Sequence, residues 1–144
     1  MLNKLDGFTL IELLIIIMII GVLASVMVPI LLSSQKRTYD AGSQTCAKSI
    51  QNVQAIQLID NLKYSKIGAG GITSSTDGID HSCRQPQIYI SDRSDPIALS
   101  SNYTIDIWDK RGSKVFTITA SEIQPNAPGA TTFSDTGSGG INLP

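Results

Sequence analysis

The chain has 144 residues and a formal net charge of −1, from eleven Lys and Arg against twelve Asp and Glu, with a single His. This balance excludes a strongly basic nucleic-acid-binding domain, and one His leaves neither a His-based metal cluster nor a catalytic triad supported by further histidines. The length allows one modest globular domain beside any membrane segment.

The most informative stretch is Gly7-Phe8-Thr9-Leu10-Ile11-Glu12, which precedes a long apolar run. Residues 13–32 contain no charged side chain and no His. At ~1.5 Å per residue they form a helix of about 30 Å, the thickness of a bilayer's hydrocarbon core. Glu12 stands at the N-terminal edge of this run, where an unpaired carboxylate costs about 3 kcal/mol. If the chain is cut after Gly7, the new α-amine of Phe8 lies one turn from Glu12, and a neighbouring copy can offer its own amine to that carboxylate.

These residues resemble the class III leader and N-terminal helix of type IV pilins and of their relatives, the pseudopilins of type II secretion. The likeness comprises a leader over residues 1–7, Phe8 as the new N-terminus and an apolar run that contains Gly21 and Pro29. It implies removal of the leader by a prepilin peptidase, N-methylation of Phe8, and pairing of Phe8 with Glu12 on assembly. An ordinary signal anchor, with Glu12 reaching to the interface, is the alternative.

The charges that flank the apolar run and the leader resemblance predict opposite orientations of the chain in the membrane. Lys36 and Arg37 follow the apolar run whereas Lys4 is offset by Asp6, so charge counting alone would keep the C-terminal part in the cytoplasm. The leader resemblance implies a cytoplasmic cleavage site and an external head, and a pair of cysteines agrees with that. We therefore expect an inner-membrane precursor with a periplasmic head, and an extracellular filament after assembly.

The helix is expected to run well beyond the membrane. Residues 8–35 form the predicted transmembrane and filament-core segment, and residues 36–63 continue it, with Cys46, Ile50 and Val53 at helical spacing. Further apolar positions widen this stripe, as expected if one face packs on a sheet and another on filament neighbours.

Two residues weaken the apolar half of this helix. Pro29 cannot donate to the carbonyl of Ser25, and Gly21 costs about 1 kcal/mol in a helix. A bend or a melted turn between them is expected. In pilin filaments, a similar stretch between such a Gly and Pro can unwind on assembly, so the resemblance implies a melted turn. A simple kink is the alternative.

The head, residues 36–144, is predicted to be α+β, with the second half of the helix packed on a small antiparallel sheet, which is the pilin fold. Residues 64–86 are rich in turn formers and correspond to a pilin's αβ-loop. Residues 87–123 contain three short strand-like runs, 87–91, 103–108 and 114–119, the last two joined by a hairpin. The run 103–107 is expected to place one face on the helix and expose the other. Residues 124–144 are expected to form an irregular tail.

Cys46 and Cys83 are expected to form a disulfide that ties the αβ-loop to the helix. It would close a loop of about 38 residues and contribute about 4 kcal/mol in the chain-entropy model. Reduced, buried cysteines are the alternative. Many type IVa pilins instead close a C-terminal loop with a disulfide, and that loop has no counterpart here because no Cys follows Cys83.

No metal site or cofactor is predicted. Asp77, Asp80 and His81 lie close together in the chain, and Asp92 and Asp95 follow, but their spacing matches no complete calcium loop. A solvated acidic loop is the expectation.

A small basic group at the hairpin and two aromatic residues complete the candidates. Lys110, Arg111 and Lys114 are expected to be solvated turn charges, with contact to DNA or a surface as the alternative. Trp108 and Tyr103 are expected to pack in the sheet.

The resemblance implies a structural protein without enzymatic activity. Its expected partners are other copies of itself in a helical filament, prepilin peptidase, the inner-membrane pilus assembly machinery, the membrane before assembly, and DNA or surfaces. The expected roles are attachment, twitching motility or DNA uptake. Alternatives are a type II secretion pseudopilin, a minor pilin, or a single-pass anchor that displays a binding head.

Overall fold

The structure is a computed structural model that describes residues 8–68, 70–73, 77–128, 133 and 140–143. Gly7 and the rest of the leader lie outside the described residues. The chain divides into two units, Met1–Ser34 and Gln35–Pro144, and each is described by itself.

One long helix, α1 (Leu10–Asn61), accounts for most of the first unit and enters the second. It stays helical through Gly21 and Pro29. Two serine hydroxyls near these positions donate to backbone carbonyls one turn back, Ser25 to Val22 at 2.7 Å and Ser33 to Ile30 at 2.9 Å. A melted turn is therefore absent between residues 21 and 29 of this structure, and unwinding on assembly remains a proposal for the filament.

The C-terminal end of α1 is fixed by a left-handed residue and a buried amide. Leu62 has φ +55°, the conformation that commonly ends helices. Gln54, fully buried, accepts from the backbone N–H of Ser65 at 2.9 Å and donates to the carbonyl of Ser65 at 2.5 Å. The chain therefore leaves the helix in a defined direction.

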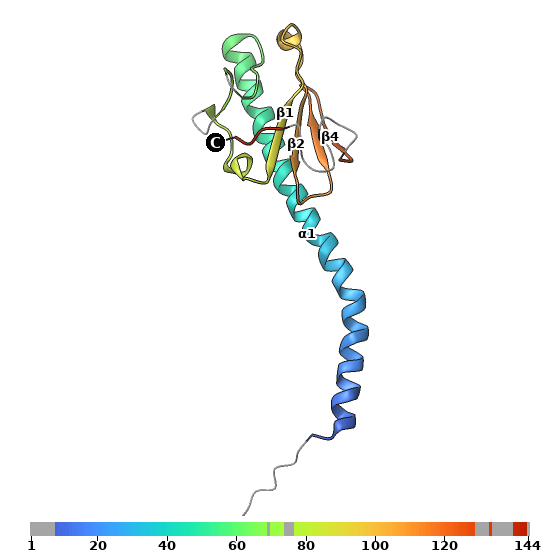
Figure 1. Cartoon of the computed structure of the whole chain (residues 1–144). Helices are drawn as coiled ribbons and strands as arrows, with labels where there is room; N and C mark the ends of the chain where they lie inside the picture. Colours follow the sequence, from blue (N-terminus) through green and yellow to red (C-terminus); the bar gives the residue numbers. More distant parts are fainter. Residues whose placement is uncertain (1–7, 69, 74–76, 129–132, 134–139, 144) are drawn as a thin grey trace, which may run out of the picture. The chain divides into compact units, whose positions relative to one another are not determined.

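Four antiparallel strands form a single sheet beside the second half of α1 (Figure 1). They are β1 (Ile88–Asp92), β2 (Ile105–Asp109), β3 (Val115–Ile118) and β4 (Ile123–Asn126), in the order β1-β2-β3-β4. The predicted α+β fold is confirmed. β3 falls within its predicted run, and β1 and β2 each end one residue beyond theirs.

The main core lies between α1 and the sheet. The buried face of α1 supplies Cys46, Ala47, Ile50 and Val53. The strands supply alternate residues, as expected for side chains that share one face of a sheet: Ile88, Ile90, Ile105, Ile107, Phe116 and Ile118.

The prediction of an exposed second face on β2 is wrong. All five residues of β2 are buried. Trp108 packs against Val115 and Phe133, with 5.8 Å between the two aromatic ring centres. Asp106 is fully buried and receives two hydrogen bonds from Arg93, at 2.7 and 3.0 Å, which raise the pKa of that guanidinium. The cover on Trp108 comes from Phe133, beyond residue 124, and the sequence pattern did not show it.

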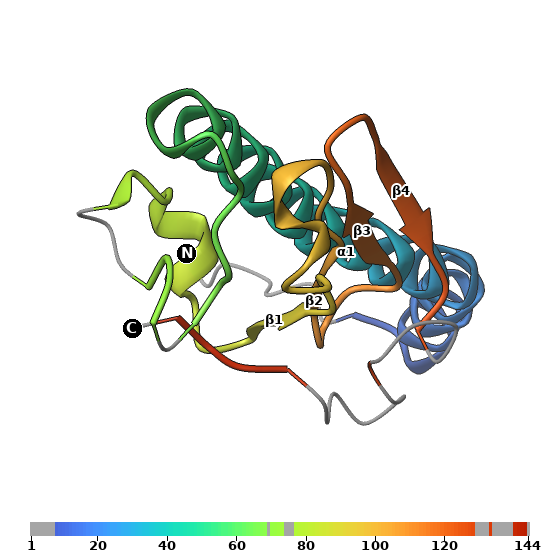
Figure 2. The same cartoon turned by 90° about the horizontal axis from the view of Figure 1, so that it is seen from above.

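The prediction of an irregular tail after residue 124 is also wrong in part. β4 occupies Ile123–Asn126, and Ile141 forms an antiparallel bridge with Ile90, with both hydrogen bonds at 2.8 Å. Figure 2 shows this C-terminal segment alongside β1. Phe133 and Leu143 are both buried, so isolated apolar residues in a polar segment complete the core.

Candidate functional site

The first half of α1 exposes nearly all of its apolar surface. Large apolar side chains between residues 8 and 32 range from 41% exposed at Ile16 to 81% at Leu10. Within the described residues, α1 is the one helix long and apolar enough to cross a membrane, with a mean hydropathy of 3.0 in its most apolar window. An apolar surface of this extent needs lipid or protein to cover it.

Glu12 is held by a capping box at the start of this helix. Its Oε2 accepts from the backbone N–H of Thr9 at 2.9 Å and from the Thr9 hydroxyl at 2.7 Å. In return the Thr9 hydroxyl accepts from the backbone N–H of Glu12 at 3.3 Å. This reciprocal arrangement is the S/T-x-x-E motif of helix N-termini.

The capping role was missed by the sequence analysis, although Thr9-Leu10-Ile11-Glu12 carries its pattern directly before an apolar run. The motif uses one carboxylate oxygen. Among the described residues, the other oxygen, Oε1, accepts no hydrogen bond from a side chain or a backbone amide. Phe8, 79% exposed, directly precedes Thr9. One acceptor therefore stays available at the helix end.

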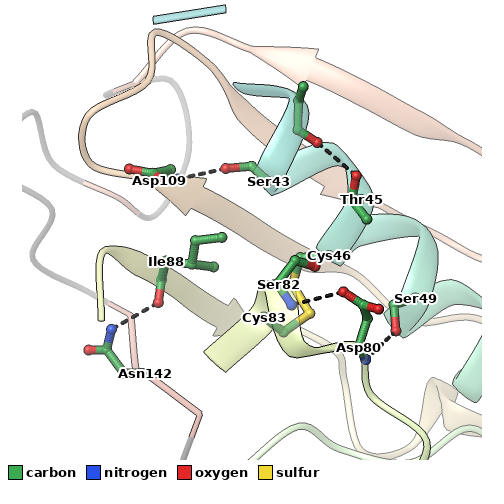
Figure 3. The surroundings of a disulfide bond; sticks show 11 residues. Ser43, Thr45, Cys46, Ser49, Asp80, Ser82, Cys83, Ile88, Asp109 and Asn142 are labelled. Carbon is green, nitrogen blue, oxygen red and sulfur yellow. Dashed lines mark hydrogen bonds between the residues drawn. A yellow bond between two sulfur atoms is a disulfide. The ribbon is translucent and has the colours of Figure 1, made fainter. Parts of the chain in front are cut away.

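In the second unit, Cys46 of α1 and Cys83 form the predicted disulfide, with Cα atoms 4.8 Å apart and neither residue exposed (Figure 3). Cys83 lies in a short 3-10 helix, η2 (His81–Arg84). Asp80 caps η2 by accepting from Ser82 N–H at 2.8 Å, and this hydrogen bond lowers the pKa of the carboxyl. The backbone N–H of Asp80 donates to the Ser49 hydroxyl of α1 at 2.8 Å. The αβ-loop is thus tied to the helix at two adjacent points.

Asp40 of α1 holds the β2–β3 hairpin. Its Oδ1 accepts from the backbone N–H groups of Ser113 at 2.8 Å and Lys114 at 3.0 Å, and its Oδ2 from the Ser113 hydroxyl at 2.7 Å. A Cβ on Gly112 would lie 2.4 Å from Oδ1, so this close approach needs glycine. The helix carboxylate, buried at 8% exposure, replaces part of the hairpin's own hydrogen bonding.

Arg111, expected to be a solvated turn charge, is engaged instead. Its guanidinium binds both oxygens of the buried Asp109, at 3.0 and 2.7 Å, and stacks over the Tyr39 ring at 4.2 Å. These hydrogen bonds raise the pKa of Arg111. The backbone N–H of Asp109 donates to Ser43 of α1 at 2.8 Å (Figure 3). Lys110 and Lys114 remain exposed.

The carboxylates considered for metal binding accept hydrogen bonds from backbone N–H groups of the loops. Asp92 accepts from the N–H groups of Ile67 and Ser94, and Asp95 accepts from Ile97 N–H. In the part of the chain that the structure describes, no three His, Cys, Asp or Glu residues are grouped to hold a metal ion.

The N-terminal motif and the α+β fold together resemble those of type IV pilins. Residues 3–28 match the family model described as the prokaryotic N-terminal methylation motif. The chain is 44% identical over 59 residues to the type IV wide pilus major component PilA4 of Thermus thermophilus. That match covers 41% of this chain and 45% of the relative, so it spans less than half of either protein.

Proposed function

We propose that the chain is a structural subunit of a type IV pilus that polymerises through residues 8–35 after cleavage between Gly7 and Phe8. The observation that carries the proposal is the Glu12 carboxylate at the start of an exposed apolar helix, where only Oε2 accepts hydrogen bonds from the described residues. The name of the relative, a major component of a type IV pilus, supports the same role.

The proposed assembly contact joins the Phe8 amine of one copy to the Glu12 carboxylate of another. Thr9 occupies Oε2 of Glu12, which leaves Oε1 to accept from an incoming amine. In a lipid or protein-filled surrounding, an unpaired carboxylate and an unpaired ammonium are each costly, so the pair forms most favourably when two helices lie side by side. The apolar surface of residues 13–32 is covered in the same step.

Attachment, twitching motility and DNA uptake follow as the proposed roles of the filament. The inner-membrane pilus machinery and prepilin peptidase are its proposed partners. The precursor and the unassembled subunit reside in the inner membrane with the head outside, and the assembled subunit is extracellular. The exposed apolar helix supports both locations because lipid and neighbouring helices cover it equally well.

Two matched variants separate the proposed pairing from the cap. Glu12→Gln keeps a neutral acceptor at the capping-box position but removes the charge. Thr9→Val removes the hydroxyl that makes two of the three capping hydrogen bonds and keeps the charge. The yield of filaments sheared from cells is expected to fall at least about tenfold in Glu12→Gln, because a paired charge is lost, and to stay near normal in Thr9→Val.

Membrane-fraction immunoblots are the control, and both variants are expected to insert normally. Normal filament yield from Glu12→Gln, or equal loss in the two variants, would show that the Glu12 charge does not act between subunits.

A further inference from the structure

The cations that follow the apolar run are not explained by filament assembly. Lys36 and Arg37 lie on the side that the proposed function places outside the cytoplasm, where the usual charge bias disfavours them. Both are exposed, and among the described residues neither forms an ion pair. Two free cations at this position call for a partner of opposite charge.

Arg37 lies on a groove within the head, between α1 and the sheet. The groove has a volume of about 550 Å³, within the range of roughly 300–1,000 Å³ usual for ligand pockets. Polar and apolar residues line it, among them Arg37, Asp40 and Gln44 of α1, Lys114 of the hairpin, Phe116 of β3 and Pro125 of β4. Arg37 and Lys114 therefore reach the same groove from two segments far apart in sequence.

The charge on the groove is available to an anion. Asp40 is its one acidic lining residue, and three hydrogen bonds from Ser113 and Lys114 already occupy both of its oxygens. Lys114, like Arg37, is exposed and forms no ion pair within the described part of the chain. Two unpaired cations thus face a groove with one carboxylate, whose oxygens are engaged by the hairpin, and the formal charge of the lining is +1.

The length of chain between the groove and the apolar run selects the anion. Arg37 follows Leu32, the last residue of the run, by five residues, which is about 8 Å of helix. The headgroup layer of a bilayer is about 5–8 Å thick on each side of the hydrocarbon core. A residue at this separation from a membrane-spanning segment lies at the level of the lipid phosphates.

We propose that the groove between Arg37 and Lys114 binds the phosphate headgroup of an anionic phospholipid while the subunit is still in the membrane. The guanidinium and the ammonium contact the phosphate. The proposal rests on the membrane-resident precursor of the proposed function. It gives Arg37 and Lys114 a role before assembly, and it makes release of the lipid part of extraction into the filament.

Native mass spectrometry of the full-length chain tests this. The protein is kept in a non-ionic detergent with equal parts of phosphatidylglycerol and phosphatidylcholine, and the ratio of the two lipids retained is measured. We expect phosphatidylglycerol to be preferred, and the preference to fall roughly fivefold for each cation removed in Arg37→Gln, Lys114→Gln and the double variant. Because the cations are exposed, added salt is expected to weaken the preference.

Lys48→Gln with Lys63→Gln is the matched control, since these exposed lysines lie elsewhere on the head. It is expected to keep the wild-type preference. Equal retention of the two lipids, or equal loss in the control pair, would overturn the proposal. So would displacement of phosphatidylglycerol by duplex DNA or by inorganic phosphate at matched ionic strength, since either would identify a general phosphate site. The measurement needs no filament, so a failed lipid preference with normal filaments would leave the proposed function standing.

Discussion

The two halves of α1 differ in what covers their apolar side chains. Up to residue 32 the apolar residues surround the helix and are exposed, whereas from residue 46 the buried ones fall on a single face, at Cys46, Ile50 and Val53. The second half is stabilised by the head's own sheet, hairpin and disulfide. The first half lacks such cover in its own unit. One continuous helix therefore has a first half suited to lipid or neighbouring helices and a second half suited to the core of its own head. Changes in the head should alter its folding without altering membrane insertion.

The disulfide gives the largest expected effect on the head. Replacing both Cys46 and Cys83 by Ser removes a cross-link between residues that lie 37 positions apart in the chain. Because the unfolded chain then gains conformational entropy, the free energy of unfolding is expected to fall by about 4 kcal/mol. Thermal unfolding of the full-length chain in detergent, followed by circular dichroism, measures this. Unchanged membrane insertion is the control, and an unfolding temperature equal to wild type would remove the disulfide from this account.

Asp40 gives the next largest effect, because it links the second half of α1 to the hairpin. Asp40→Ala leaves three donors without their acceptor and is expected to cost about 2–3 kcal/mol. Asp40→Asn keeps one acceptor and should cost less. The matched control is Asp60→Ala, an exposed position on the same helix, with an expected change within about 0.5 kcal/mol. Equal unfolding midpoints for Asp40→Ala and Asp60→Ala would contradict the proposed link.

Tyr103 is expected to make the head less stable at alkaline pH. Burial, and to a smaller extent neighbouring Tyr64, raises the pKa of Tyr103 to about 12. Since the folded-state pKa lies above the unfolded value near 10, the contribution of Tyr103 is complete below pH ~10 and is lost as the pH rises toward 12, by about 1–2 kcal/mol.

Chemical unfolding at several alkaline pH values measures this loss. Tyr103→Phe is expected to flatten it, and Tyr39→Phe to leave it as in wild type. The same alkaline slope in all three proteins would assign the loss to other groups.

Substitution of Leu62 is expected to have the smallest effect on the stability of the head, and to increase that stability. Its φ of +55° is unfavourable for a side chain with Cβ, and the side chain is 81% exposed. Leu62→Gly is expected to stabilise the head by about 0.5–1 kcal/mol, whereas Leu62→Ala keeps the strain and should change little. Denaturant midpoints compare the two variants, and a loss of stability in Leu62→Gly would mean that the side chain itself contributes.

Much of the head was readable from sequence because its signals are local. The helical spacing of Cys46, Ile50 and Val53 predicted the packed face of α1, and three short strand-like runs predicted β1 to β3. β4 was missed because Pro125 argues against a strand and is tolerated here at the edge of the sheet.

The cover on the outer face of β2 was missed for a different reason. Phe133 stands alone in a polar stretch, so no periodicity marks it. Gly140 was predicted to lie in an irregular tail, yet a Cβ there would lie 2.4 Å from the Phe133 ring and 3.0 Å from Tyr89. Such contacts depend on where the chain returns in space, and spacing along the sequence carries no information about that.

At the candidate assembly site, the sequence identified Glu12 but not its cap. The cost of a lone carboxylate drew attention to a partner in another copy, and the nearer partner, Thr9, lies three residues before it. The capping box shows that the uncleaved helix has its own way to hold the charge. The proposed pairing with Phe8 would therefore use only the second oxygen, after the proposed removal of the leader.

Mass spectrometry of the N-terminal peptide from filaments sheared off intact cells tests whether this chain is a processed filament subunit. We expect a mature chain that begins at Phe8 and carries a methylated α-amine. Filaments in which this chain still begins at Met1, or from which this chain is missing, would contradict it.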